Sequence, residues 1–230
     1  MKKVDLSSVR VFVFDLDDTL YDESLFVKGG TNAVLNYLTC RYHITTSTLY
    51  KVMNSIVSVF PRNVWYQKLL EKVGIPFSQE LIDEMVEIYR THSPNIQLFP
   101  DATHFIDQTK KKGDTFLGLI TDGLVAVQES KVRSLDLYKQ MNLIIFTWNK
   151  GAEFQKPNTW SFKSIEKKSG ASGIECCYFG NDPSKDFLAP NKLGWITVCI
   201  RRNRFGSVAI PSYEYAAQME ISSFDEISLD

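Results

Sequence analysis

Five short apolar runs divide this chain, and none of them alternates apolar with polar residues. Each is four to six residues long, at positions 11–14, 116–120, 143–146, 176–179 and 195–200. Runs of this kind are typical of strands buried on both faces, as in a parallel sheet. Helical spacing lies between them, at Val127, Lys131, Val132 and Leu135, and at Trp160, Phe162 and Ile165 after Pro157, which we expect in a first helical turn.

Alternating strands and helices predict an α/β fold, a doubly wound, Rossmann-like parallel sheet with right-handed crossovers. One connection is unusual, because about a hundred residues separate the first two runs where a crossover needs only a dozen or more. Apolar stripes fill this connection, with Leu49, Val52, Met53, Ile56 and Phe60 in one, Leu69, Leu70 and Val73 in the next, and Leu81, Ile82, Met85, Ile88 and Tyr89 in the last. We therefore predict a core domain of residues 1–21 and 98–230, with an all-helical domain of residues 22–97 inserted between two strands.

The composition excludes several classes of protein. The 230 residues carry 26 Lys and Arg against 27 Asp and Glu, so the net charge of −1 argues against binding to nucleic acid polymers. No apolar run approaches the roughly 20 residues of a membrane helix, and Asp5 and Asp15 interrupt any signal-peptide core. Four cysteines are too few for a disulfide framework in a chain of this length. We expect a cytoplasmic protein that does not bind membranes.

Acidic residues follow the first run, in the string Asp15-Leu16-Asp17-Asp18-Thr19. Ligands of open α/β sheets bind at the carboxyl ends of the strands, where these acids fall. Three acids within four residues repel one another, unlike a plain capping turn, and such repulsion usually indicates a cation or a function.

Three further strand ends carry polar residues. Thr121-Asp122-Gly123 offers a hydroxyl and backbone N–H groups to an anion, although one of these residues also suits a simple helix cap. Lys156 precedes Pro157, where it can reach a phosphate or an aspartate or lie in solvent. Asn181, Asp182 and Asp186 follow Gly180 with oxygen ligands that suit a hard cation.

Together these four strings resemble the motifs, in order, of the haloacid dehalogenase-like (HAD) superfamily, and the resemblance covers nearly the whole chain. It implies an enzyme, a hydrolase of the phosphatase branch whose helical insertion is a cap of the first type. Asp15 would be the nucleophile that forms a phosphoaspartate, and Asp17 the general acid and base. Dehalogenases of the family lack that second acid, so Asp17 argues for phosphate chemistry.

The resemblance also implies the binding residues. Thr121 and Lys156 would be catalytic and, with Asp122 and Gly123, would bind the phosphate. Mg²⁺ would be held by Asp15, the Asp17 backbone carbonyl and Asp182. Many relatives have Asp at the position of Asn181, so the alternative that Asn181 contacts the metal stays open.

The sequence thus predicts a Mg²⁺-dependent phosphatase for a small phosphorylated metabolite, a sugar phosphate or a nucleotide monophosphate. A phosphomutase with the same residues, or a non-catalytic phosphate-binding or partner-binding protein, are the alternatives. Several other residues are weaker candidates for substrate contacts, and for each of them core packing or solvation is the simpler interpretation: Tyr21, Phe26, Lys28, Arg62, Trp65, Arg201, Arg202 and Arg204.

Overall fold

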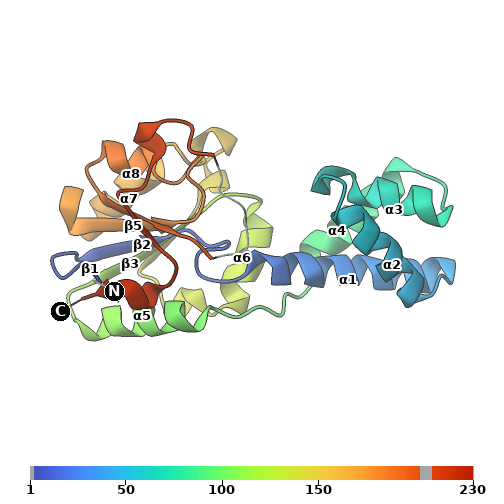
Figure 1. The fold of residues 1–230 in the computed structure, drawn as a ribbon, viewed down its shortest axis with the longest axis horizontal. Helices are drawn as coiled ribbons and strands as arrows, with labels where there is room; N and C mark the ends of the chain where they lie inside the picture. Colours follow the sequence, from blue (N-terminus) through green and yellow to red (C-terminus); the bar gives the residue numbers. More distant parts are fainter. Residues whose placement is uncertain (1–2, 203–208, 230) are drawn as a thin grey trace. The chain divides into compact units, whose positions relative to one another are not determined.

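A computed structural model describes residues 3–202 and 209–229 of the chain. The chain divides into two compact units, one of residues 1–23 with 96–230 and one of residues 24–95 (Figure 1). The assignment of residues 22–97 as a cap over a site stays a prediction. Within the described ranges, no helix is both long enough and apolar enough to span a bilayer.

A six-stranded parallel sheet forms the centre of the larger unit, in the order β4-β3-β2-β5-β6-β7. Its strands are β2 (Val11–Phe14), β3 (Phe116–Thr121), β4 (Leu143–Phe146), β5 (Cys176–Gly180), β6 (Ile196–Ile200) and β7 (Met219–Ile221). The five apolar runs therefore are the five adjacent strands, and the predicted doubly wound α/β fold with a helical insertion is confirmed. A separate two-stranded pair, β1 (Val4–Asp5) with β8 (Ile227–Ser228), had no signal in the sequence.

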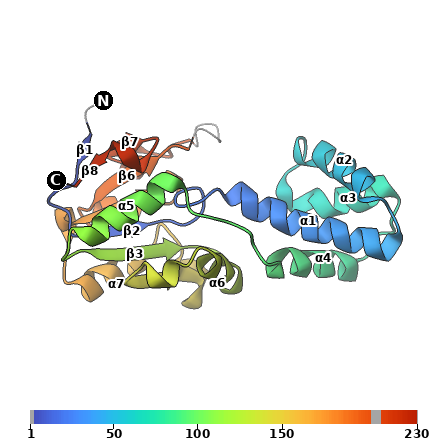
Figure 2. The ribbon, with the colours of Figure 1, turned by 90° about the horizontal axis from the view of Figure 1, so that it is seen from below.

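Helices cover both faces of the sheet, which explains why the strands do not alternate (Figure 2). On one face, Phe12 and Phe14 of β2 pack edge-on against Phe105 of α5 (Pro100–Lys111), with ring centroids 5.7 and 6.2 Å apart. On the other face, Val13 shares a buried cluster with Phe162 of α7 (Trp160–Ser169). Every residue of β2 is thereby buried, as the continuous apolar run predicted.

Two helix starts differ from the prediction. The helix α6 (Val125–Ser134) begins beyond Gly123, and no side chain caps it, so neither Thr121 nor Asp122 is its N-cap. Pro157 lies in the turn before α7, after a cis peptide bond with Lys156. The helix begins at Trp160 because its N–H is taken by the Asn158 side chain, 2.9 Å away. A short helix α8 (Leu188–Lys192) completes this unit.

The smaller unit is entirely helical, as predicted. Its helices are α1 (Glu23–Tyr42), α2 (Thr46–Val57), α3 (Trp65–Val73) and α4 (Gln79–Thr91). The three apolar stripes of the sequence fall on α2, α3 and α4 and meet in one buried cluster. Thr45 and Ser78 cap α2 and α4, and Gly74 ends α3 in the left-handed conformation that glycine favours.

Candidate active site

The carboxyl ends of β2 and β5 bring Asp15 and Lys156 together inside the larger unit. The Asp15 backbone N–H donates to the Phe179 carbonyl at 2.8 Å, which extends the pairing of these strands by one residue. The Lys156 Nζ lies 2.6 Å from Asp15 Oδ1, 2.8 Å from Asp186 Oδ1 and 3.0 Å from the Tyr178 hydroxyl. An ammonium has three protons, so every one of them is directed at a buried oxygen.

Asp186 holds this lysine and also shapes the loop after β5. Its second oxygen accepts the backbone N–H groups of Asn181 and Asp182 at 3.1 and 2.9 Å. A Cβ on Gly180 would lie 2.5 Å from that oxygen, so glycine leaves room for the carboxylate there. Both Asp186 oxygens are thus used within the protein, and Asp186 acts as a partner of Lys156.

Two buried carboxylates share one ammonium in this cluster, and the excess is negative. Burial raises the pKa of Asp15 to about 7, with Lys156 opposing the rise and Asp186 adding to it. For Lys156, burial alone would lower the pKa, but the charges of Asp15 and Asp186 raise it well above its usual value. The lysine therefore stays protonated, while Asp15 is the group whose charge depends on what else binds.

Asp17 has a different environment from Asp15, although only one residue separates them. Its carboxylate accepts hydrogen bonds from the Tyr21 hydroxyl at 2.5 Å, from Lys131 at 2.7 Å and from Gln128 at 2.9 Å. Burial would raise the pKa of Asp17, but the Lys131 charge and these hydrogen bonds together lower it below its usual value. Gln128 also donates to the Thr121 hydroxyl at 2.5 Å, which links the ends of β2 and β3.

Asp122 and Gly123 form the turn after β3. One Asp122 oxygen accepts the Thr147 hydroxyl at 2.8 Å and the Lys156 backbone N–H at 3.2 Å, so this carboxylate fixes the segment that carries the lysine. Its other oxygen is buried without a hydrogen bond, 3.9 Å from Lys185 Nζ. Gly123 has a φ of 112°, a backbone conformation that other residues rarely adopt.

Asp182 lies on the loop after β5 and is partly exposed. One of its oxygens accepts the backbone N–H and the hydroxyl of Ser184, at 3.0 and 2.6 Å. Over the ranges that the structure describes, no three His, Cys, Asp or Glu side chains gather into a metal cage. The donors that are present still suit Mg²⁺, which needs only one or two carboxylates beside water and phosphate oxygens, and the excess negative charge of the buried cluster favours a cation.

Sequence reasoning missed four residues that complete this arrangement. Asp186 was noted only for its spacing from Asp182, and Tyr178 was taken as part of an apolar strand. Gln128 and Lys131 lie on α6, and the one usable signal was a lysine within the apolar stripe of that helix. Tyr21, for which core packing was the simpler interpretation, is buried but also bonds Asp17.

The expectation of a solvated basic loop at residues 201–204 is wrong for Arg202, whose side chain is only 12% exposed. It donates to Asp101 at 2.7 Å and to the Thr19 carbonyl at 3.1 Å, because Asp101 and the ring of Phe99 provide a partner and a packing surface. Arg201 pairs with Glu220 at 3.0 Å, and Arg204 lies outside the described residues.

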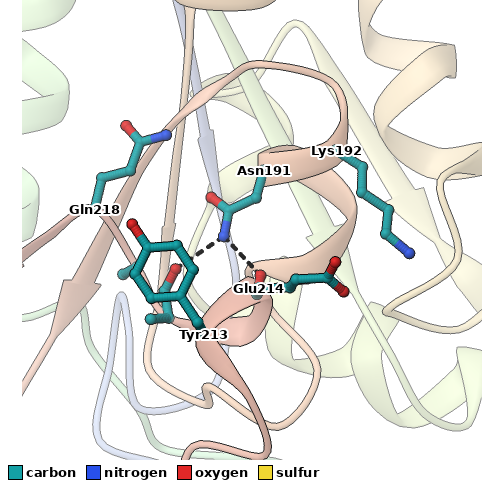
Figure 3. A pocket seen from close by; sticks show the side chains of 7 residues that line it. Asn191, Lys192, Tyr213, Glu214 and Gln218 are labelled. Carbon is teal, nitrogen blue, oxygen red and sulfur yellow. Dashed lines mark hydrogen bonds between the residues drawn. The ribbon is translucent and has the colours of Figure 1, made fainter.

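A hollow of about 360 Å³ elsewhere in the larger unit contains none of these residues (Figure 3). Asn191, Tyr213 and Gln218 line it. The amide of Asn191 already donates to the carbonyls of Glu214 and Ala216, at 2.9 and 2.8 Å. Its polar groups therefore serve the local fold, and the strand ends remain the candidate site.

Comparison with known proteins places this fold and site in a family. Residues 12–200 match the family described as haloacid dehalogenase-like hydrolase. The chain belongs to this family and is an enzyme of the hydrolase class, as the sequence predicted.

Curated relatives and solved structures agree with this assignment. Glyceraldehyde 3-phosphate phosphatases are similar to the chain: that of Methanopyrus kandleri is 26% identical over 86% of both proteins, and that of Methanocaldococcus jannaschii is 26% identical over 95% of both. A HAD phosphatase structure from Thermococcus onnurineus shares the fold, with a TM-score of 0.59, 19% identity and 95% coverage of both chains. A Bacillus subtilis protein assigned to the HAD hydrolases and solved with magnesium has a TM-score of 0.64 and 17% identity, covering 95% of this chain and 96% of that one.

Proposed function

We propose that this protein is a Mg²⁺-dependent phosphatase that hydrolyses a small sugar phosphate through a phosphoaspartate intermediate. The observation that carries the proposal is the buried Asp15, held 2.6 Å from Lys156 at the end of a central strand. Glyceraldehyde 3-phosphate is the first substrate to test, because the relatives named above are phosphatases of that compound and match nearly the full chain.

In the first step, an Asp15 oxygen attacks phosphorus, and the bond from phosphorus to the substrate's alkoxy oxygen breaks. An ionised carboxylate needs no base to act as a nucleophile. Lys156 holds this carboxylate in place and offsets the negative charge that approaches it. Asp17, in its protonated form, gives its proton to the leaving oxygen, so the products are an alcohol and phosphorylated Asp15.

In the second step, Asp17 accepts a proton from water, and the water oxygen attacks the phosphorus of the phosphoaspartate. The bond between phosphorus and Asp15 breaks, which releases inorganic phosphate and restores both carboxylates. Thr121 and the backbone N–H groups near Asp122 and Gly123 would bind the remaining phosphate oxygens.

Mg²⁺ would be held by the Asp15 carboxylate, the Asp17 backbone carbonyl and the Asp182 carboxylate, with the Asn181 amide oxygen as the alternative to Asp182. When bound, the ion supplies positive charge that lets a phosphate dianion approach the acidic residues. Mg²⁺ affinity measured for Asp182→Asn and Asn181→Ala separates the two ligands, because only the variant that lacks the true ligand binds the ion more weakly.

The test measures phosphate release from glyceraldehyde 3-phosphate, other sugar phosphates and nucleotide monophosphates, with Mg²⁺ and with chelator. A blank without protein corrects for spontaneous loss of phosphate. We expect metal-dependent release that falls by more than about a thousandfold in Asp15→Asn, since that change removes the nucleophile. Asp114→Asn, which alters an exposed carboxylate, is the matched control. Full activity of Asp15→Asn would refute the nucleophile, and turnover without free phosphate would indicate a mutase.

A further inference from the structure

Lys131 is a buried lysine on a helix face that otherwise packs against the core. Its side chain is only 4% exposed, and the nearby Val132 is fully buried. Removing an ammonium from water costs free energy unless a charge and hydrogen bonds compensate for the loss. The printed geometry gives that compensation, because the Lys131 Nζ lies 2.7 Å from Asp17 Oδ1.

Gln128 holds the same carboxylate from one turn earlier on α6. Residues three apart on a helix share a face, so Gln128 and Lys131 both reach toward the end of β2. Gln128 donates to Asp17 Oδ2 at 2.9 Å and is itself 3% exposed. Tyr21 donates to Oδ1 at 2.5 Å from the other side. Two segments far apart in the sequence thus fix both oxygens of Asp17.

The three donors leave one direction of the carboxylate open. A carboxylate has about four lone-pair directions, two on each oxygen. Tyr21 and Lys131 take both directions on Oδ1, whereas among the described residues Oδ2 accepts only the Gln128 amide. The side chain of Asp17 is also 25% exposed, so Oδ2 is the oxygen that can still meet a substrate or a water.

We propose that Lys131 is a positioning residue that, with Gln128, fixes the Asp17 carboxylate so that Oδ2 is the atom that carries the proton. This inference rests on the proposed function. Lys131 contacts Asp17 and no reacting atom, so it acts through the position of that carboxylate. Its removal impairs the steps that need a proton from Asp17 and spares those that do not.

The test compares two leaving groups in kcat/KM, which reports the transfer of phosphate to Asp15. Glyceraldehyde 3-phosphate releases a strongly basic alkoxide that needs a proton, whereas p-nitrophenyl phosphate releases a weakly basic phenolate. Lys131→Met keeps the length of the side chain and removes its charge. We expect it to lower kcat/KM at least about tenfold for glyceraldehyde 3-phosphate and less than about threefold for p-nitrophenyl phosphate.

Two controls test the specificity of this effect. Arg133→Met removes an exposed cation from the same helix and leaves both substrates within about twofold of the wild-type protein. In an Asp17→Asn background, Lys131→Met causes no further selective loss, because the carboxylate it positions is gone. Gln128→Leu, which leaves no unpaired charge, repeats the selective loss and serves if Lys131→Met does not fold.

Equal losses for both substrates, or no loss for either, in the folded variants would overturn the inference. That outcome in the presence of an active wild-type protein leaves the proposed function intact. A wild-type protein that releases no phosphate from either compound instead refutes the proposed function, and this inference with it.

Discussion

Asp186 is the residue whose replacement tests the buried cluster most directly. The change Asp186→Asn keeps the size of the side chain and lets its remaining oxygen accept the backbone N–H groups of Asn181 and Asp182. The new amide N–H₂ group then faces Lys156 Nζ, where the carboxylate oxygen lies at 2.8 Å in the native protein. Two donors meet at that point, and Lys156 loses one of its two charged partners.

The magnitude follows from the burial of the pair, because both side chains are fully buried. Breaking a buried ion pair costs about 3–5 kcal/mol, and losing one hydrogen bond to a charged group costs about 1.5–3 kcal/mol. Lys156 retains Asp15 and Tyr178 as partners, so we expect a loss near the lower end, about 3 kcal/mol. In a chain of this size, that loss lowers Tm by about 6–12 °C.

Urea unfolding followed by circular dichroism and tryptophan fluorescence measures this loss, with chelator present so that no cation compensates for the missing charge. The control is Asp182→Asn, the same chemical change on a partly exposed residue of the same loop, for which we expect a loss below about 1 kcal/mol. If the two variants unfold at the same urea concentration, Asp186 does not stabilise Lys156 and the reasoning is wrong.

Two further predictions follow from the same cluster. The raised pKa of Asp15 means that the folded protein keeps a proton which the unfolded chain releases, so the free energy of unfolding falls as pH rises from about 4 to about 7; Asp15→Asn lacks this fall, and urea midpoints at pH 5 and pH 8 with chelator check it, parallel slopes for both proteins being the contrary result. Tyr178→Phe leaves one Lys156 proton unpaired and costs about 1–3 kcal/mol of stability, without changing the ratio of kcat/KM between glyceraldehyde 3-phosphate and p-nitrophenyl phosphate; a changed ratio would show that Tyr178 acts on the proton transfer as well.

Much of the fold was predictable because burial on both faces leaves a clear mark on a strand. Each residue of β2 packs against a helix on one face or the other, so the sequence contains an unbroken apolar run. The 20-residue helix α1 had no such mark, since Gly30 and Thr31 interrupt its buried side. The two-residue strands β1 and β8 are too short for any periodicity.

The positions of the candidate site were predictable for a different reason. Asp15, Thr121 and Asp182 each follow an apolar run, and parallel strands bring their carboxyl ends to one edge. The partners that hold these side chains were not predictable, because they depend on which helix face meets which strand. Lys131 and Gln128 read as ordinary helix residues until α6 is placed against the end of β2, and Asp186 becomes a partner of Lys156 only when the loop after Gly180 has its native shape.

The wide spacing of the bonded residues along the chain has a consequence for folding. Asp15 and Lys156 are 141 residues apart, and Asp17 and Lys131 are 114 apart. No local segment contains either pair, so closing these long loops must precede both contacts. The reactive centre therefore belongs to the last, most global level of organisation in the larger unit. Regained catalysis is accordingly a stricter measure of refolding than regained helix content, which short stretches of chain can contribute by themselves.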